Sequence, residues 1–199
     1  MTALLNHNVL VQGNLKHPPI CHGEWICITG DNGSGKSTLV KSISASQVNI
    51  SYMAQDYKPS NYPLGMRVSD YLCASLAHTS NMMDSSAIQG VYASYSTMNI
   101  ASYADQRIAT LSRGQLQKVV ITEVLNKSFN LLLLDEPFNH LDTLSINSLI
   151  KYLKLKHLKQ AFAMLVVTHQ PQIKRYCSKI WHIKDQKCHH CNNNKCIYD

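Results

Sequence analysis

Residues 25–38 read WICITGDNGSGKST, and this stretch decides the fold. The apolar run before Gly30 is typical of a buried strand, and the residues after Lys36 have helical spacing. Between them, GDNGSGKS fits the pattern G-x-x-x-x-G-K-[ST], in which glycines let backbone N–H groups curl around phosphates at the start of a helix. The pattern predicts a phosphate-binding loop made of Gly30, Asp31, Asn32, Gly33, Ser34, Gly35, Lys36, Ser37 and Thr38.

Two side chains of this loop have predicted roles. Lys36 is expected to reach the β- and γ-phosphates of a nucleotide, and the Ser37 hydroxyl to bind Mg²⁺. A glycine-rich strand-to-helix turn also occurs without a ligand, but such a turn gives no structural reason for the lysine and the serine. The loop therefore predicts a nucleotide site with a divalent cation.

A second stretch, LLLLDEPFNHLD at 131–142, has two acids directly after its most apolar run. Burying an unpaired charge is costly, so a binding partner is expected there. A strand that delivers Asp135 next to the phosphate-binding loop supplies a direct or water-mediated Mg²⁺ ligand. Glu136, one residue further on, is placed to polarise an attacking water.

The order of patterns along the chain predicts an α/β fold. Apolar strand patterns alternate with helical ones, which favours a mainly parallel sheet with helices packed on it. We expect one domain over 1–199, with a core from 1–55 and 127–187, and an inserted helical subdomain at about 56–126. The remainder, 188–199, is expected to form a Cys- and His-containing tail.

Further motifs make the chain similar to the ATP-binding cassette (ABC) ATPases, a family of P-loop NTPases with a RecA-like core. GDNGSGKS and LLLLDE resemble Walker A and Walker B. SYMAQD resembles the Q-loop, LSRGQLQK the signature motif, NHLD the D-loop and VVTHQ the switch-histidine segment. The family's functional positions then fall on Gln55, Ser112, Gly114, Gln115, Asp142 and His169.

The resemblance implies a mechanism with ATP and Mg²⁺ as cofactors. Two cassettes pack head to tail, so this chain would form a homodimer in which the signature motif of one copy clasps the ATP of the other. His169 would hold the γ-phosphate and water, and Gln55 would bind Mg²⁺ and link to a partner. Asp142 would lie at the seam between the two copies. Glu136, His169 and Gln55 are the expected catalytic residues.

Three departures from the family pattern affect these expectations. Residues 1–24 contain no Phe, Tyr or Trp to stack on adenine, and His7 and His17 are the candidate substitutes. Arg113 replaces the second glycine of the signature motif, a change that we expect function to survive. Lys36 and Gln55 are separated by 19 positions, which predicts a reduced N-terminal β-subdomain.

Composition limits the classes of protein. The net charge is +7, and residues 151–199 hold ten of the 19 Lys and Arg residues. This concentration indicates either a solvated basic surface or contact with an anionic partner. No apolar run approaches the roughly 18 residues of a membrane helix. Seven cysteines, an odd number, favour reduced thiols. We expect a cytoplasmic protein, peripheral to the inner (plasma) membrane, with no nucleic-acid partner.

Several functions of such a cassette stay open. The simplest is the subunit that energises an ABC transporter together with an integral-membrane permease. EPFNHLD also resembles the corresponding stretch of ABC-F translation factors, which act on the ribosome. SYMAQDYKPSNYPLGMRVSDYL and LSRGQLQKV resemble zinc or manganese uptake cassettes, whereas GEWICITGDNGSGK and THQP resemble the haem-exporter cassette of cytochrome c maturation. DEPF, at 135–138, resembles both and favours neither.

The tail, KCHHCNNNKC at 187–196, is rich in possible metal ligands. Cys188 and Cys191 have C-x-x-C spacing, and His189 and His190 lie between them, so these four residues are a candidate zinc site. His182 is a further possible ligand. The alternative is a polar tail with exposed thiols.

Overall fold

The structure, a computed structural model, describes residues 3–5, 17–45, 49–58, 60, 62, 65–77, 95–185, 187–192 and 195–197. The chain divides into two compact units. The first comprises residues 1–55, 129–137 and 156–199, and the second comprises residues 56–128 and 138–155. Each unit is therefore assembled from segments that are distant in the sequence.

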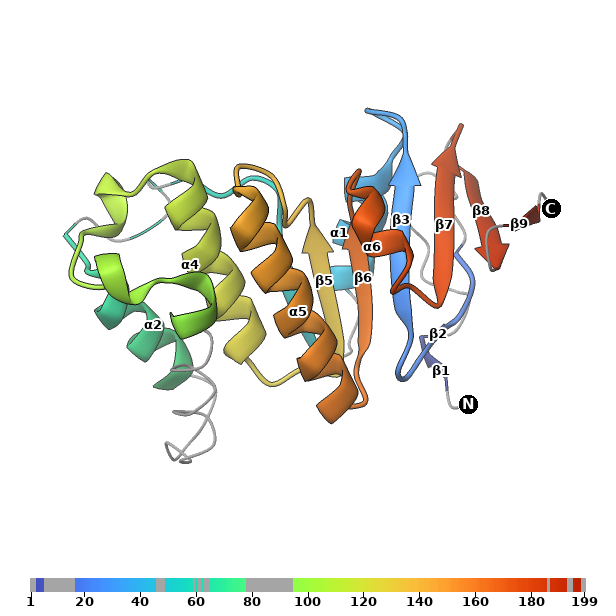
Figure 1. Ribbon diagram of the computed structural model, residues 1–199. Helices are drawn as coiled ribbons and strands as arrows, with labels where there is room; N and C mark the ends of the chain where they lie inside the picture. The colour runs from blue at the N-terminus through green and yellow to red at the C-terminus, as the bar shows by residue number, and fades with distance from the viewer. Residues whose placement is uncertain are drawn as a thin grey trace. The chain divides into compact units, whose positions relative to one another are not determined.

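The first unit is built on a seven-stranded sheet with the order β4-β5-β6-β3-β7-β8-β9 (Figure 1). Its strands are β3 (Trp25–Gly30), β4 (Ile50–Met53), β5 (Leu131–Asp135), β6 (Ala163–Val167), β7 (Lys179–Lys184), β8 (Lys187–Asn192) and β9 (Lys195–Ile197). All pairs from β4 to β7 are parallel, and β8 and β9 continue the sheet antiparallel. The predicted α/β fold with a mainly parallel sheet is confirmed.

Every residue of β5 and β6 is buried, because both faces of the central strands are covered. Helix α1 (Lys36–Ser44) packs on the sheet through Leu39, Val40 and Ile43, which share one side of the helix. Each such side chain contributes about 1.5–3 kcal/mol when it leaves water. Three short elements complete this unit: β1 (Ala3–Leu5), which pairs antiparallel with β2 (Ile20–Cys21), and α6 (Pro171–Lys174).

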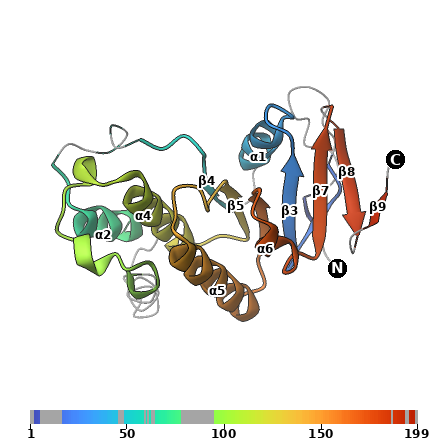
Figure 2. The same ribbon diagram turned by 45° about the horizontal axis from the view of Figure 1, so that its top comes forward.

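The second unit is helical among its described residues. It contains α2 (Val68–Ala77), η2 (Ala101–Tyr103), η3 (Ile108–Thr110), α4 (Arg113–Asn126) and the greater part of α5 (Thr143–Lys159). Helices α2 and α4 pack side by side (Figure 2). No helix in the described part of the chain is long and apolar enough to cross a bilayer.

One boundary differs from the expected organisation. Residues 138–155 were assigned to the core from sequence, but they cluster with 56–128. The physical reason lies in the turn before α5, because the His140 carbonyl packs on Gly114 and the Asp142 carboxylate lies near the Lys118 ammonium. The strand patterns alone gave no sign of these contacts.

Candidate functional site

The loop between β3 and α1 takes a backbone path that requires glycine. Gly30 has φ 146°, and a Cβ at this position would collide with the Ile183 carbonyl oxygen of the neighbouring strand. Gly35 has φ 102° and directly precedes α1. Residues other than glycine rarely adopt these backbone conformations. The two glycines therefore turn the chain from strand to helix within five residues, which brings the first N–H groups of α1 to the loop.

The Lys36 ammonium is held inside this loop. Lys36 is only 8% exposed. The Nζ atom donates to the carbonyl oxygens of Gly30 and Asp31, each at 2.8 Å. A nearly buried ammonium needs such acceptors, since desolvation without them is costly. The positive charge is thus fixed where the sequence predicts phosphates.

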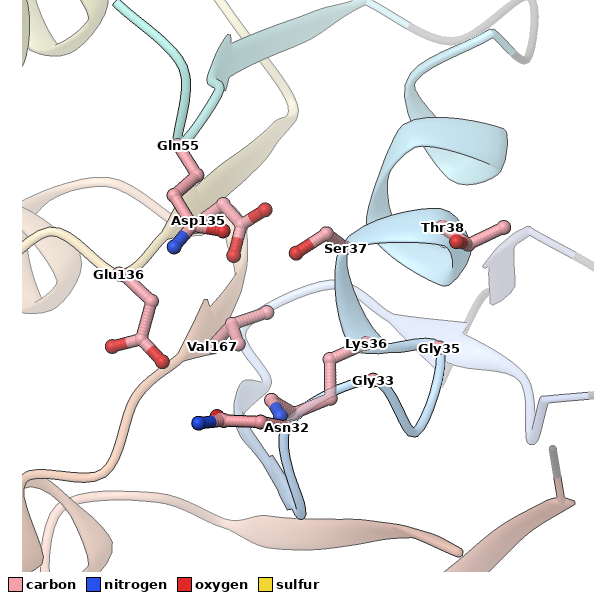
Figure 3. Close-up of a pocket in the computed structure, with 10 residues that line it drawn as sticks. All are labelled: Asn32, Gly33, Gly35, Lys36, Ser37, Thr38, Gln55, Asp135, Glu136 and Val167. Atoms are coloured by element: carbon pink, nitrogen blue, oxygen red, sulfur yellow. The ribbon is translucent and has the colours of Figure 1, made fainter. Parts of the chain in front are cut away.

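A pocket of about 400 Å³ opens beside the loop (Figure 3). It is lined by Asn32, Gly33, Gly35, Lys36, Ser37, Thr38, Gln55, Asp135, Glu136 and Val167. The Ser37 hydroxyl and the Asp135 carboxylate point toward one another, and Gln55 extends toward the same place (Figure 3). Hydroxyl, amide and carboxylate oxygens are hard donors, so this set fits Mg²⁺. The three predicted Mg²⁺ ligands therefore lie in one pocket.

Asp135 is the last residue of β5 and is only 1% exposed. Its negative charge acts on the adjacent strand: the pKa of Tyr52 rises to about 12, through burial of the phenol and through the Asp135 carboxylate. A carboxylate buried this deeply requires compensating interactions. Its position between the strand end and Ser37 is suited to a cation.

Glu136 leaves the strand direction and enters the pocket. Its φ is 51°, and its N–H still donates to the Val167 carbonyl at 3.0 Å, so the backbone turns immediately after the last ladder bond. The His169 Nε2 atom lies 3.4 Å from Oε1 of Glu136. Burial raises the pKa of Glu136, whereas the nearby His169 opposes the rise. A carboxylate with a raised pKa is a stronger base, as a proton acceptor requires.

In the second unit, the predicted signature residues form the start of α4. Ser112 Oγ accepts from the Gln115 N–H at 3.2 Å, and Gln115 Oε1 accepts from the Ser112 N–H at 2.9 Å. This reciprocal capping box fixes the first helical turn. A Cβ on Gly114 would come within 2.5 Å of the His140 carbonyl oxygen. Glycine is needed here for close approach, because the turn before α5 lies directly against the helix.

That turn carries the predicted D-loop residue. Asp142 accepts from the Ser145 N–H at 2.8 Å and from its hydroxyl at 2.9 Å, which caps the start of α5. These bonds lower the pKa of Asp142, first through the Ser145 backbone N–H. The Lys118 Nζ atom lies 3.8 Å from Oδ2 of Asp142. Sequence reasoning missed this lysine, because no motif includes it.

Other expected positions have mixed outcomes. His17, a suggested stacking partner for adenine, is 2% exposed and stacks on Trp181 with ring centroids 5.6 Å apart, so it belongs to the core. His7 lies outside the described residues. Val167 lines the pocket and was missed, although its place at the end of a buried strand before His169 could have indicated it.

The candidate zinc residues lie on a strand. Residues 187–192 form β8, in which successive side chains alternate between two faces. Cys188 packs against the apolar core, and its burial raises the pKa of the thiol to about 12. The register pairs Cys188 with Ile183 and His189 with His182, so these two neighbours lie on opposite faces of the strand. The side chains of His190 and Cys191 lie outside the described residues, so the four-ligand site stays a prediction.

A P-loop pocket in the same chain as a capped LSRGQ helix defines an ATP-binding cassette. The chain matches the model of the ABC transporter family over residues 19–139. It is 33% identical over 171 residues to the ATP-binding protein Uup of Buchnera aphidicola, an alignment that covers 79% of this chain and 27% of that protein. It is 29% identical over 161 residues to the zinc import ATP-binding protein ZnuC of Acinetobacter baylyi, covering 75% and 58%.

The fold comparison agrees. A solved structure described as the ATP binding subunit of an ABC transporter has a TM-score of 0.77 at 18% identity, and the match covers 91% of this chain and 83% of that one. The match to the family model over residues 19–139 shows that the chain belongs to the ABC transporter family. It spans about a quarter and somewhat over half of the two curated relatives described above. Further relatives are named for sn-glycerol-3-phosphate import and macrolide export.

Proposed function

We propose that this chain is the ATP-binding and ATP-hydrolysing subunit of an ABC transporter. The pocket of about 400 Å³ carries the proposal, because it gathers Lys36, Ser37, Gln55, Asp135 and Glu136 from three separate segments of the chain. A buried lysine, a buried carboxylate and a second acid of raised pKa have no evident structural purpose in one pocket. Together they match the needs of a bound nucleoside triphosphate.

The residues divide the work of hydrolysis. The backbone N–H groups of the loop and Lys36 bind the phosphates, with the helix start adding its partial positive charge. Ser37, Asp135 and Gln55 would hold Mg²⁺, which when bound neutralises phosphate charge. Glu136 accepts a proton from the attacking water, and His169, 3.4 Å from Glu136, orients that carboxylate and the water.

The active form is a homodimer in this proposal. Ser112, Gly114 and Gln115 would present the start of α4 to the γ-phosphate held by a second copy, and Asp142 would lie at the seam. The capping box supports this role. It fixes the helix start and uses only the N–H groups of Ser112 and Gln115 to do so. ATP would join the two copies, and hydrolysis would release them.

The proposed partner is an integral-membrane permease, with the cassette peripheral to the cytoplasmic side of the inner (plasma) membrane. Zinc or manganese is the proposed cargo, supported by the stretch after Gln55 and by the zinc-import relative. A haem-export cassette is an alternative. A second candidate, a soluble ABC-F-like ATPase acting on the ribosome, rests on EPFNHLD at 136–142.

Glu136→Gln tests the chemistry. We expect ATP turnover to fall by about 10²- to 10⁴-fold, the usual contribution of a general base, while ATP binding persists. Phosphate release gives the rate, and size-exclusion chromatography with ATP should show a stable dimer. Asp185→Asn is the matched control: it makes the same acid-to-amide change at an exposed turn, where Asn tolerates the φ of 49°. Unchanged turnover in Glu136→Gln would contradict the assigned role.

Co-purification tests the partner. The full chain, tagged and expressed in its native cell, should isolate with a multi-span membrane protein after detergent extraction. Co-sedimentation with ribosomes in place of this would favour the ABC-F-like alternative. The identity of the co-purified permease and the metal dependence of cell growth would then test the cargo.

A further inference from the structure

Strand β3 and the turn between α6 and β7 hold two cysteines against each other. Cys27 lies within β3 and is fully buried, whereas Cys177, in the turn, is partly exposed. Both are free thiols, and their side chains are in hydrogen-bond contact. Because the two residues are far apart in the sequence, the fold and not a local motif makes them a pair.

Alternation along β3 directs Cys27 away from helix α1. Ile26 and Ile28 pack with the apolar residues of α1 in one core cluster. Successive side chains of a strand point to opposite faces, so Cys27, between these two residues, points to the other face of the sheet.

The turn is fastened to the first residue of β3. The Ser178 N–H donates to the Trp25 carbonyl at 2.8 Å, and the Trp25 N–H donates to the Ser178 hydroxyl at 3.1 Å. The Tyr176 ring stacks on the Trp25 ring with centroids 6.0 Å apart. Cys177 lies between these two anchoring residues, so its sulfur is held within reach of Cys27.

The contact changes the reactivity of both thiols. The hydrogen bond with Cys177 lowers the pKa of Cys27, against the opposing effect of burial, and the nearby Lys174 ammonium lowers this pKa further. The same hydrogen bond raises the pKa of Cys177, and burial acts in the same direction. Since the thiolate is the nucleophile that forms a disulfide, Cys27 is suited to attack a sulfur atom. Cys177 is suited to meet an oxidant first, because it is the more exposed of the two.

The turn is also connected to the candidate catalytic residues. Helix α6 begins at Pro171, two residues after His169, and the fully buried Ile173 anchors it. The Cys177 sulfur lies 3.3 Å from the Ile173 carbonyl oxygen. A movement of this sulfur therefore reaches α6 and, through it, His169, whose Nε2 atom lies 3.4 Å from Glu136.

We propose that Cys27 and Cys177 are a redox-sensitive pair, which a peroxide joins in a disulfide that slows ATP turnover. In the first step the Cys177 sulfur bonds to one peroxide oxygen and the O–O bond breaks. The sulfur becomes a sulfenic acid, and the other oxygen leaves as water with the thiol proton. In the second step the Cys27 sulfur attacks the Cys177 sulfur, the S–S bond forms and the S–O bond breaks. Hydroxide leaves as a second water with the Cys27 proton, so the thiol pair loses the two electrons that the peroxide gains.

The disulfide displaces the turn more than the strand. It brings the two sulfur atoms to about 2.05 Å, closer than a hydrogen-bond contact. Strand β3 is paired with β6 on one side and β7 on the other, so the turn and α6 must supply the movement. Because a misplacement of about 1 Å can cost about 100-fold in rate, we expect turnover to fall by about tenfold or more. This effect rests on the proposed function, whereas formation of the disulfide does not.

Peptide mapping of the full chain tests the pair. Trypsin cleaves after lysine and arginine, so it leaves Cys177 in YCSK at 176–179 and Cys27 in the peptide 17–36. Because Cys21 shares the second peptide, Cys21→Ser is the background for every measurement. After excess hydrogen peroxide, mass spectrometry without reductant should find the two peptides joined, with the loss of two hydrogen atoms. Dithiothreitol should separate them.

Phosphate release from the same samples tests the consequence. Turnover in the background chain should fall by about tenfold or more in peroxide and should return with dithiothreitol. Cys177→Ser should keep its turnover in peroxide. Cys188→Ser, which changes another partly exposed cysteine, should lose turnover as the background does.

Three results would overturn the proposal. They are the absence of the joined peptide, a joined peptide with unchanged turnover, and an equal loss of turnover in Cys177→Ser. If the reduced background chain hydrolyses no ATP, the proposed function fails, and the joined peptide alone decides whether the two cysteines are a redox pair.

Discussion

The pocket of the first unit and the signature turn of the second hold their polar groups in different ways. In the pocket, Lys36, Asp135 and Glu136 are 8%, 1% and 9% exposed and come from two segments about 100 residues apart. In the turn, Ser112 bonds Gln115 at the surface, and the exposed Asp142 bonds the buried Ser145, each pair within three residues. Pocket residues therefore depend on one another's charge, whereas the turn depends on local capping and close packing.

Lys36→Ala should give the largest effect on ATP affinity and should leave the second unit unchanged. Hydrogen bonds to a charged group contribute about 1.5–3 kcal/mol, so we expect ATP affinity to fall by roughly 10- to 150-fold. Titration with a fluorescent ATP analogue measures the loss. Lys41→Ala removes an exposed lysine from the same helix and should bind as the parent does. Equal affinity in Lys36→Ala and the parent would break the distinction between the two regions.

Gly114→Ala should lower the folding stability and leave ATP affinity unchanged. The added Cβ would lie 2.5 Å from the His140 carbonyl oxygen, so the helix start and the turn must separate. Overpacking of this kind costs about 1–3 kcal/mol, which urea unfolding measures. ATP affinity of the monomer should stay at the parent value, because the pocket lies in the other unit. Arg113→Ala, at the adjacent exposed position, is the control, and a similar loss there would refute the packing explanation.

The difference between the regions also explains what the sequence could predict. A phosphate-binding loop is a local requirement: Gly30, Gly35 and Lys36 must stand at fixed spacing for backbone N–H groups to meet an anion, so the pattern is visible in eight residues. Glu136 and Asp135 follow from an apolar strand that ends in acids. The parallel sheet follows from the alternation of strands and helices.

The contacts that sequence reasoning missed join residues without a shared local pattern. Gly114 meets His140 across 26 positions, and Lys118 meets Asp142 across 24, so neither steric nor ionic contact leaves a periodic trace. Residues 188–199 are expected from the sequence to form a Cys- and His-containing tail. Their strand is apparent only in the pairing of β8 with β7, which partly buries Cys188 and leaves His189 on the other face.

The smallest expected effects, and the sharpest comparison, concern two acids with opposite pKa shifts. Burial raises the folded pKa of Glu136, so the native state binds an extra proton between the unfolded and folded values, and stability falls as pH rises through that interval. Hydrogen bonds from Ser145 lower the folded pKa of Asp142, so its contribution is present above the unfolded pKa and is lost as pH falls through the folded one.

Removing each charge should therefore shift stability in opposite directions. Relative to the parent, Glu136→Gln should gain stability as pH rises above the unfolded pKa of glutamate, about 4.3, whereas Asp142→Asn should lose stability as pH rises through the unfolded pKa of aspartate, about 3.9. Urea unfolding of both variants as a function of pH measures the two differences. Asn can still cap α5, so the loss in Asp142→Asn reports the charge more than the cap. Parallel pH trends would mean that the turn, like the pocket, is governed by burial, and would end the distinction between the two regions.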